Sequence, residues 1–99
     1  MTALKQAEML RNIKLDSVRN FVTIVHDIDV SNDSLFQGVV RTALDVCSIT
    51  PNELANKLGV SPTSISRWKS GKNLPHVLGR STVVEVMYEN AKAELESLV

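Results

Sequence analysis

Cysteine, aromatic residues and long apolar runs are all scarce in this chain. A single cysteine among 99 residues cannot form an internal disulfide and indicates a reducing compartment, so we expect a cytoplasmic protein. Aromatic residues make up 4% of the chain, so any core must consist mainly of aliphatic side chains. No apolar run approaches the roughly 18 residues of a spanning helix, and the first residues do not resemble a signal peptide, so no membrane partner is expected.

The residues that carry enzyme chemistry are also scarce. Two histidines and one cysteine leave too few side chains for a metal site, so we expect neither a metal nor a cofactor. No paired acid and base, phosphate-binding loop or metal-ligand spacing is present, and the sequence therefore predicts a protein that is not an enzyme.

Charge is unevenly distributed, although the net charge is zero. Residues 1–49 carry a net charge of −1 and residues 81–99 a net charge of −3. Residues 50–80 carry five basic side chains against Glu53 alone, a net charge of +4; the five are Lys57, Arg67, Lys69, Lys72 and Arg80. A positive charge confined to 31 residues indicates a local surface for an anionic partner.

Apolar spacing predicts an all-α fold. We expect helices over residues 2–13, 16–28 with Asp16 as its cap, 34–47 with Asp33 or Ser34 as its cap, 51–58, 62–70 and 82–97, with a short helical piece after Pro75. Residues 21–25 are rich in β-branched side chains, so a strand is the alternative there.

The clearest local signals define two short helices. Thr50-Pro51-Asn52-Glu53 forms a capping box, and Gly59 supplies a left-handed stop. Ser61-Pro62 begins the next helix, which ends at Gly71. A three-residue turn that contains glycine sends the second helix off at roughly 90–120°. The positions expected to face inward are Leu54, Ala55, Leu58, Val60, Ile65 and Trp68.

The other face of the second short helix lacks carboxylates. It carries small hydroxyls and cations: Thr63, Ser64, Ser66, Arg67, Lys69 and Ser70. Phosphate repels carboxylates, and short side chains allow a helix to approach a groove closely, so this face is suited to nucleic acid.

Residues 50–75 resemble the helix-turn-helix of the lambda-repressor/Cro-like family of bacterial and phage transcriptional regulators. The specific parts are Leu54-Ala55, Leu58-Gly59-Val60-Ser61, Ile65-Ser66-Arg67-Trp68, Gly71 and Pro75. The resemblance covers about residues 35–97 and implies that family's five-helix DNA-binding domain, which we place at residues 33–99. Residues 1–32 lie outside it and are expected to form a helical N-terminal extension that serves as a dimer or partner surface.

The resemblance also implies roles for individual side chains. Helix 62–69 is expected to enter the major groove of double-stranded DNA, with base contacts from Thr63, Arg67 and Ser66. Phosphate contacts are expected from Ser61, Ser64, Lys69, Lys72 and Asn73. The family often has glutamine where this chain has Pro51, so that phosphate contact is lost or passes to Asn52 or to the Thr50 cap.

The sequence therefore predicts a sequence-specific DNA-binding transcription regulator, acting as a homodimer on a palindromic site. The alternative is a protein-interaction or adaptor module on the same fold without DNA binding, which the zero net charge keeps open.

Four other side chains have simpler interpretations. Trp68 and Cys47 are expected in the core, and His26 is expected on the surface near a helix end. His76, in the basic segment, is a weaker candidate for a phosphate contact.

Overall fold

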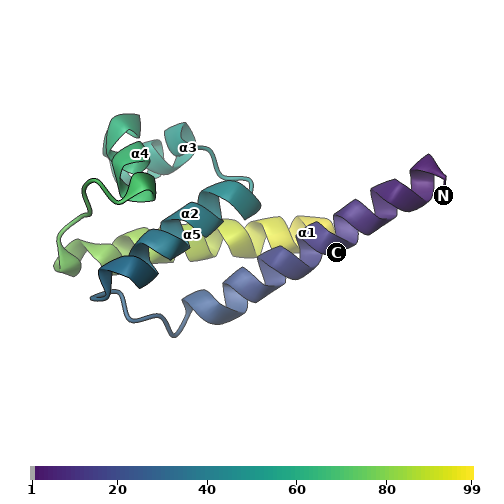
Figure 1. The fold of residues 1–99 in the computed structure, drawn as a ribbon, viewed down its shortest axis with the longest axis horizontal. Helices are drawn as coiled ribbons and strands as arrows, with labels where there is room; N and C mark the ends of the chain where they lie inside the picture. Colours follow the sequence, from purple (N-terminus) through teal and green to yellow (C-terminus); the bar gives the residue numbers. More distant parts are fainter. Residues whose placement is uncertain (1) are drawn as a thin grey trace.

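The computed structural model describes residues 2–99, which form five α-helices and no strand. The helices are α1 (Ala3–Val25), α2 (Asp33–Val46), α3 (Pro51–Leu58), α4 (Pro62–Ser70) and α5 (Val77–Leu98). The prediction of an all-α fold is confirmed. In Figure 1, the long helices α1, α2 and α5 pack against one another, and the short helices α3 and α4 lie together against α2 and α5.

Helix α1 is a single helix where two were predicted. The prediction that Asp16 begins a second helix is wrong, as is the alternative of a strand at residues 21–25. Residues 3–25 contain neither glycine nor proline, so nothing interrupts the helix that the Thr2 side chain caps by accepting a hydrogen bond from the Lys5 amide. Asp16 lies in mid-helix, 3.8 Å from Arg19.

Helix α5 is also longer than predicted, because the piece after Pro75 and the final helix are continuous from Val77. The His76 ring caps its start by accepting a hydrogen bond from the Leu78 amide. The predicted cap of α2 is corrected as well: Asn32, and not Asp33 or Ser34, accepts the hydrogen bond from the Leu35 amide, at 3.0 Å. Only four helices therefore lie within residues 33–99.

The core joins all five helices. Its buried side chains are Val18, Phe21, Val25, Phe36, Val39, Val40, Ala43, Cys47, Ile49, Leu54, Ala55, Ile65, Trp68, Val83, Met87 and Ala91. Three of these belong to α1, which runs antiparallel to α5: Arg11 donates to the Leu98 carbonyl at 2.7 Å, and Lys14 pairs with Glu94 at 3.0 Å. The division at residue 32 stays a prediction, although α1 and the following helices share this core.

The N-terminal half of α1 projects beyond the rest of the molecule (Figure 1). Its apolar side chains are largely exposed: 71% for Leu4, 68% for Leu10 and 60% for Ile13. No helix among residues 2–99 is both long enough and apolar enough to cross a bilayer.

Candidate nucleic-acid interface

The two short helices are fixed by local hydrogen bonds of the predicted kind. The Thr50 hydroxyl accepts from the Glu53 amide and donates to its carboxylate, each at 3.1 Å. The Ser61 hydroxyl accepts from the Ser64 amide at 3.2 Å. Gly59 and Gly71 end the helices with φ of 70° and 78°, a backbone conformation that favours glycine.

The inner faces of α3 and α4 pack as predicted, with one exception. Leu54, Ala55, Ile65 and Trp68 are buried, which confirms Trp68 as a core residue. Val60 was expected inside but is 37% exposed. It lies in the turn between the two helices, where its amide donates to the Ala55 carbonyl at 3.1 Å.

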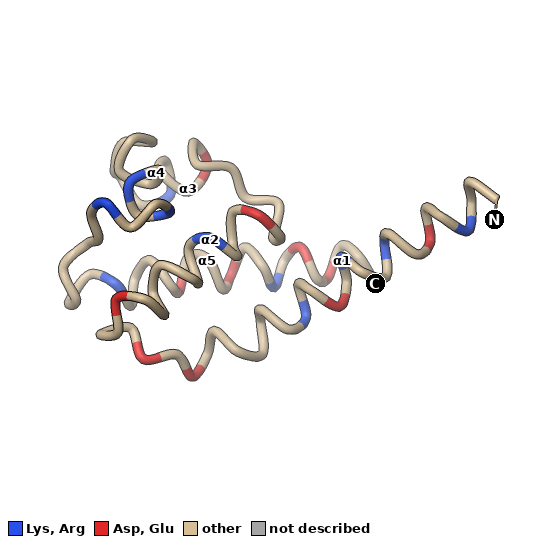
Figure 2. Tube along the Cα trace, in the orientation of Figure 1, with Lys and Arg blue, Asp and Glu red and all other residues tan. Residues whose placement is uncertain are grey.

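The outer face of α4 is accessible. Thr63, Ser66 and Arg67, the residues expected to contact bases, are all exposed on one helix. Figure 2 shows that α4 carries basic residues and no acidic ones. The nearest acidic residue along the chain is Glu53, which is occupied at the cap of α3. A DNA phosphate approaching α4 would therefore meet hydroxyls and cations from this helix.

The residues expected to contact phosphate lie in three places. Ser61 and Ser64 lie together at the start of α4, where their hydroxyls are 3.0 Å apart. Lys72 and Asn73 are exposed beyond its end, where the Asn73 amide donates to the Arg67 carbonyl at 3.5 Å. Asn52 is exposed in the first turn of α3. The Ser61 hydroxyl caps the helix, and one of the two hydroxyls donates to the other, which leaves one proton of the pair for a further acceptor.

Lys69 differs from the other candidates because it already has an acidic partner. Its ammonium lies 2.8 Å from the Asp45 carboxylate on α2. Gln37, also on α2, donates from its side chain to the Lys69 carbonyl at 3.1 Å. A Cβ at Gly71 would lie 2.8 Å from the Gln37 Nε2 atom, at the end of a flexible side chain, so the positive φ is the stronger reason for glycine here.

Sequence reasoning missed the part that α2 plays in holding α4. Gln37, Arg41 and Asp45 are spaced four residues apart, which places them on one polar face of α2. That spacing was the available signal, but it did not reveal which helix this face would meet.

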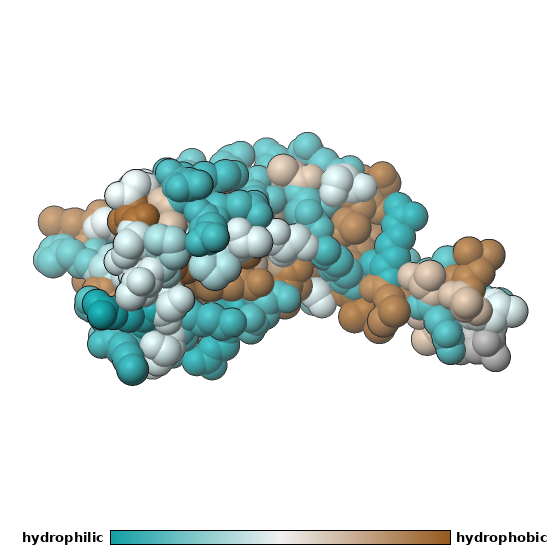
Figure 3. Space-filling view, turned by 90° about the horizontal axis from the view of Figure 1, so that it is seen from above, coloured by the Kyte–Doolittle hydropathy of each residue, from teal (hydrophilic) through white to brown (hydrophobic). Residues whose placement is uncertain are grey.

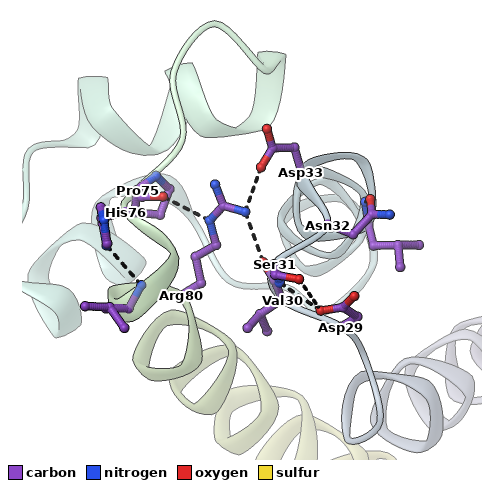
Figure 4. A network of polar contacts seen from close by, with 10 residues as sticks. Asp29, Val30, Ser31, Asn32, Asp33, Pro75, His76 and Arg80 are labelled. Atoms are coloured by element: carbon purple, nitrogen blue, oxygen red, sulfur yellow. Dashed lines mark hydrogen bonds and ion pairs between the residues drawn. The ribbon is translucent and has the colours of Figure 1, made fainter.

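The basic segment is smaller at the surface than the sequence implied, because Arg80 is only 5% exposed (Figure 4). Its guanidinium donates to the carbonyls of Pro75 and Val30 at 2.9 and 3.0 Å, and pairs with Asp33 at 2.8 Å. It also lies 5.2 Å from the centre of the Phe36 ring. Within residues 2–99, Lys57, Arg67 and Lys72 form no ion pair and remain as the exposed cations of this segment.

The remaining single residues have structural roles. Cys47 is buried, and His26 is exposed at the end of α1, edge-on to Tyr88 with ring centres 4.6 Å apart. The His76 ring is occupied as the cap of α5. The residues that the structure describes contain no group of three or more potential metal ligands.

Comparison with protein families identifies a helix-turn-helix at residues 47–77, which covers α3, α4 and their flanking turns. Searches of curated proteins and of solved structures gave no match. The matched segment contains the two capped helices, the glycine turn between them and the acid-free face of α4. Residues 47–77 of this chain thus match a helix-turn-helix of the Cro/C1 type, which supports the resemblance to the lambda-repressor/Cro-like family of DNA-binding regulators.

Proposed function

We propose that this protein is a sequence-specific DNA-binding transcription regulator that reads the major groove with α4. The observation that carries this proposal is the outer face of α4, where Thr63, Ser66 and Arg67 are exposed and the helix itself carries no carboxylate. Of these side chains, arginine has the greatest reach and pairs bidentately with a guanine edge. Thr63 and Ser66 are suited to short contacts with base edges, including the methyl group of thymine.

Affinity is proposed to come from phosphate contacts that flank α4. Lys72 and Asn73 contact the backbone at the end of the helix, and Ser61 and Ser64 contact it at the start. Asn52 contacts it from α3. Lys69 joins this set when it exchanges Asp45 for a phosphate. These contacts fix the register of the protein and carry no sequence information themselves.

A single helix of nine residues covers only a few base pairs, so the proposed species is a homodimer. Its two copies of α4 would enter successive major grooves of a palindrome, with half-sites about 34 Å apart.

The experiment is a selection from random duplex DNA, followed by binding titrations at several salt concentrations. We expect a palindromic consensus. Arg67→Ala should cost about 1–3 kcal/mol on that site and relax preference at one base pair in each half-site. Lys72→Ala should weaken all sequences about equally and lower the salt slope by about one unit.

Lys92→Ala is the control, because Lys92 is exposed on α5 outside the helix-turn-helix. If Arg67→Ala lowers the affinity for selected and for scrambled DNA equally, Arg67 contacts phosphate and not a base. If wild-type protein binds no duplex at any salt concentration, the adaptor function replaces this proposal.

A further inference from the structure

A stripe of uncharged side chains runs along the solvent side of α1. Its members are Gln6, Leu10, Ile13, Ser17, Asn20 and Ile24, and we call this set the α1 stripe. The intervals alternate between four and three residues, which is the spacing of a seam between paired helices. Leu10, Ile13 and Ile24 are 68%, 60% and 65% exposed, so three of the six positions present large apolar side chains to water.

The α1 stripe borders an apolar groove between α1 and α2. The groove is lined by Ser17, Asn20, Phe21, Ile24, Val25, Ile28, Ser34, Leu35, Gly38, Val39 and Thr42. The side of the groove formed by α2 is open to solvent. A Cβ at Gly38 would meet nothing within 4 Å, and Leu35 is 48% exposed. Figure 3 shows further apolar side chains at the projecting N-terminal end of the molecule. One chain thus has both a projecting apolar helix and an unfilled apolar groove.

We propose that the α1 stripe is the interface of a homodimer, in which two copies of α1 pair antiparallel about a two-fold axis near Ser17. In this register Leu10 of one copy opposes Ile24 of the other, and the small Ser17 side chains meet at the axis. The projecting half of each α1 then covers the α1–α2 groove of the other copy. Parallel pairing would align the projecting halves with each other and leave both grooves empty.

Charges beside the stripe favour the same arrangement. All six charged residues of α1 lie off the stripe, and Lys5 is exposed near its N-terminal end. Antiparallel pairing brings Lys5 close to Asp27 and Asp29 of the second copy, which are exposed carboxylates just beyond the C-terminal end of α1. Parallel pairing would place Lys5 against Lys5. Opposite charges beside a seam determine orientation in this way.

This inference rests on the proposed function in one respect: the dimer is the species that binding to a palindrome requires. Sedimentation of the full chain at micromolar concentrations should show a dimer. Leu10→Lys and Ile24→Lys should each be monomeric, with helical circular dichroism unchanged because both side chains are exposed. Leu78→Lys is the matched control: Leu78 is 85% exposed but lies on α5, so this variant should remain dimeric.

Cysteine cross-linking tests the register. Ser17→Cys should form a dimer disulfide on mild oxidation, and Leu10→Cys alone should not. A mixture of Leu10→Cys and Ile24→Cys chains should cross-link. Wild-type protein is the blank, because its only cysteine is buried. A monomeric wild-type chain, dimeric lysine variants, or efficient cross-linking of Leu10→Cys alone would each overturn the proposed interface.

DNA binding separates this inference from the proposed function. The monomeric variants should bind a single half-site as wild type does, and lose about a hundredfold or more in affinity on the palindrome. If the chain dimerises through α1 but binds no DNA, the interface stands and the proposed function fails. If the chain binds DNA but the lysine variants behave as wild type on the palindrome, the proposed function stands and the interface fails.

Discussion

Arg80 is the side chain whose role differs most from its appearance in the sequence. It lies in the basic segment, yet it is buried and its guanidinium joins the loop before α2 to the loop before α5 (Figure 4). Two backbone carbonyls and one carboxylate accept hydrogen bonds from it. Arginine suits this position because its planar fork can donate in several fixed directions at once.

Replacing Arg80 by methionine should therefore lower stability more than DNA affinity. The Pro75 and Val30 carbonyls would each lose a donor, and we expect a loss of about 2–3 kcal/mol in urea unfolding. The matched variant is Asp33→Asn. The Asp33 side chain is 73% exposed, so it regains water and its loss should cost under about 1 kcal/mol. Equal losses in the two variants would show that the ion pair, and not the carbonyl contacts, carries the effect.

Cys47 provides a pH-dependent contribution to stability. Burial, with Glu94 nearby, raises the pKa of the Cys47 thiol to about 11, and Lys14 opposes this shift. The folded state therefore holds a proton that the unfolded chain releases near pH 9. The free energy of unfolding should be unaffected below that pH and should fall as pH rises from about 9 to 11.

The measurement is urea unfolding between pH 7 and pH 11 for the wild type and for Cys47→Ala. Lysines and Tyr88 also titrate in this range, so the difference between the two proteins isolates the thiol. The decline should be shallower in Cys47→Ala. Parallel curves for the two proteins would rule out a contribution from Cys47.

At the scale of elements, the contact between α2 and α4 holds the proposed reading helix in place. Gln37 fixes the last turn of α4 through the Lys69 carbonyl, and Asp45 holds the Lys69 ammonium. The carboxylate of Asp45 thus neutralises one cation of the proposed DNA-binding surface. The ion pair positions Lys69 but reduces the attraction of its ammonium group for phosphate.

Asp45→Asn should consequently raise affinity for DNA of any sequence, by about twofold to fivefold at low salt, because it frees Lys69 and removes a nearby negative charge. Asp16→Asn is the control, since it removes an exposed carboxylate on α1 that likewise pairs with a basic side chain, Arg19. Fluorescence anisotropy on a random duplex measures both. An equal gain in the two variants would indicate a general effect of net charge.

The elements differ in how far the sequence determined them. The limits of α3 and α4 follow from residues beside them: Thr50, Gly59, Ser61 and Gly71 each make a local contact or adopt a local conformation. The starts of α1 and α5 also have local caps, Thr2 and His76, but the unbroken length of each helix is not marked by the residues beside it. Asp16 resembles a cap in sequence, but whether a helix continues through such a residue depends on packing against distant segments.

The candidate site shows the same division. The exposure of Thr63, Ser66 and Arg67 follows from helical spacing within α4. The burial of Arg80 and the pairing of Lys69 with Asp45 depend on residues 24 to 50 positions away, and local spacing carries no information about them.

For the whole molecule, the structure predicts a sharp difference between two truncations. A chain that starts at Met9 should unfold within about 1 kcal/mol of the full chain, because residues 2–8 are all exposed. A chain that starts at Asn32 loses Val18, Phe21 and Val25 from the core. Burial of these three side chains contributes about 5–8 kcal/mol to the free energy of folding. That amount is comparable with the entire stability of a small domain.

Thermal melting at a fixed protein concentration checks this difference, since dimerisation makes melting points depend on concentration. We expect the shorter chain to show no cooperative transition. A folded chain from Asn32 with an unchanged melting point would mean that α1 is dispensable for the core.

The antiparallel contact between α1 and α5 also has a consequence for synthesis. Helix α1 leaves the ribosome first, but its partner side chains on α5 lie more than 50 residues later along the chain. At typical rates of about 5–20 residues per second, the apolar face of α1 waits several seconds for them. The helix-turn-helix is thus translated before the core that supports it can close, so the proposed DNA-binding surface is fully supported only when α5 has emerged.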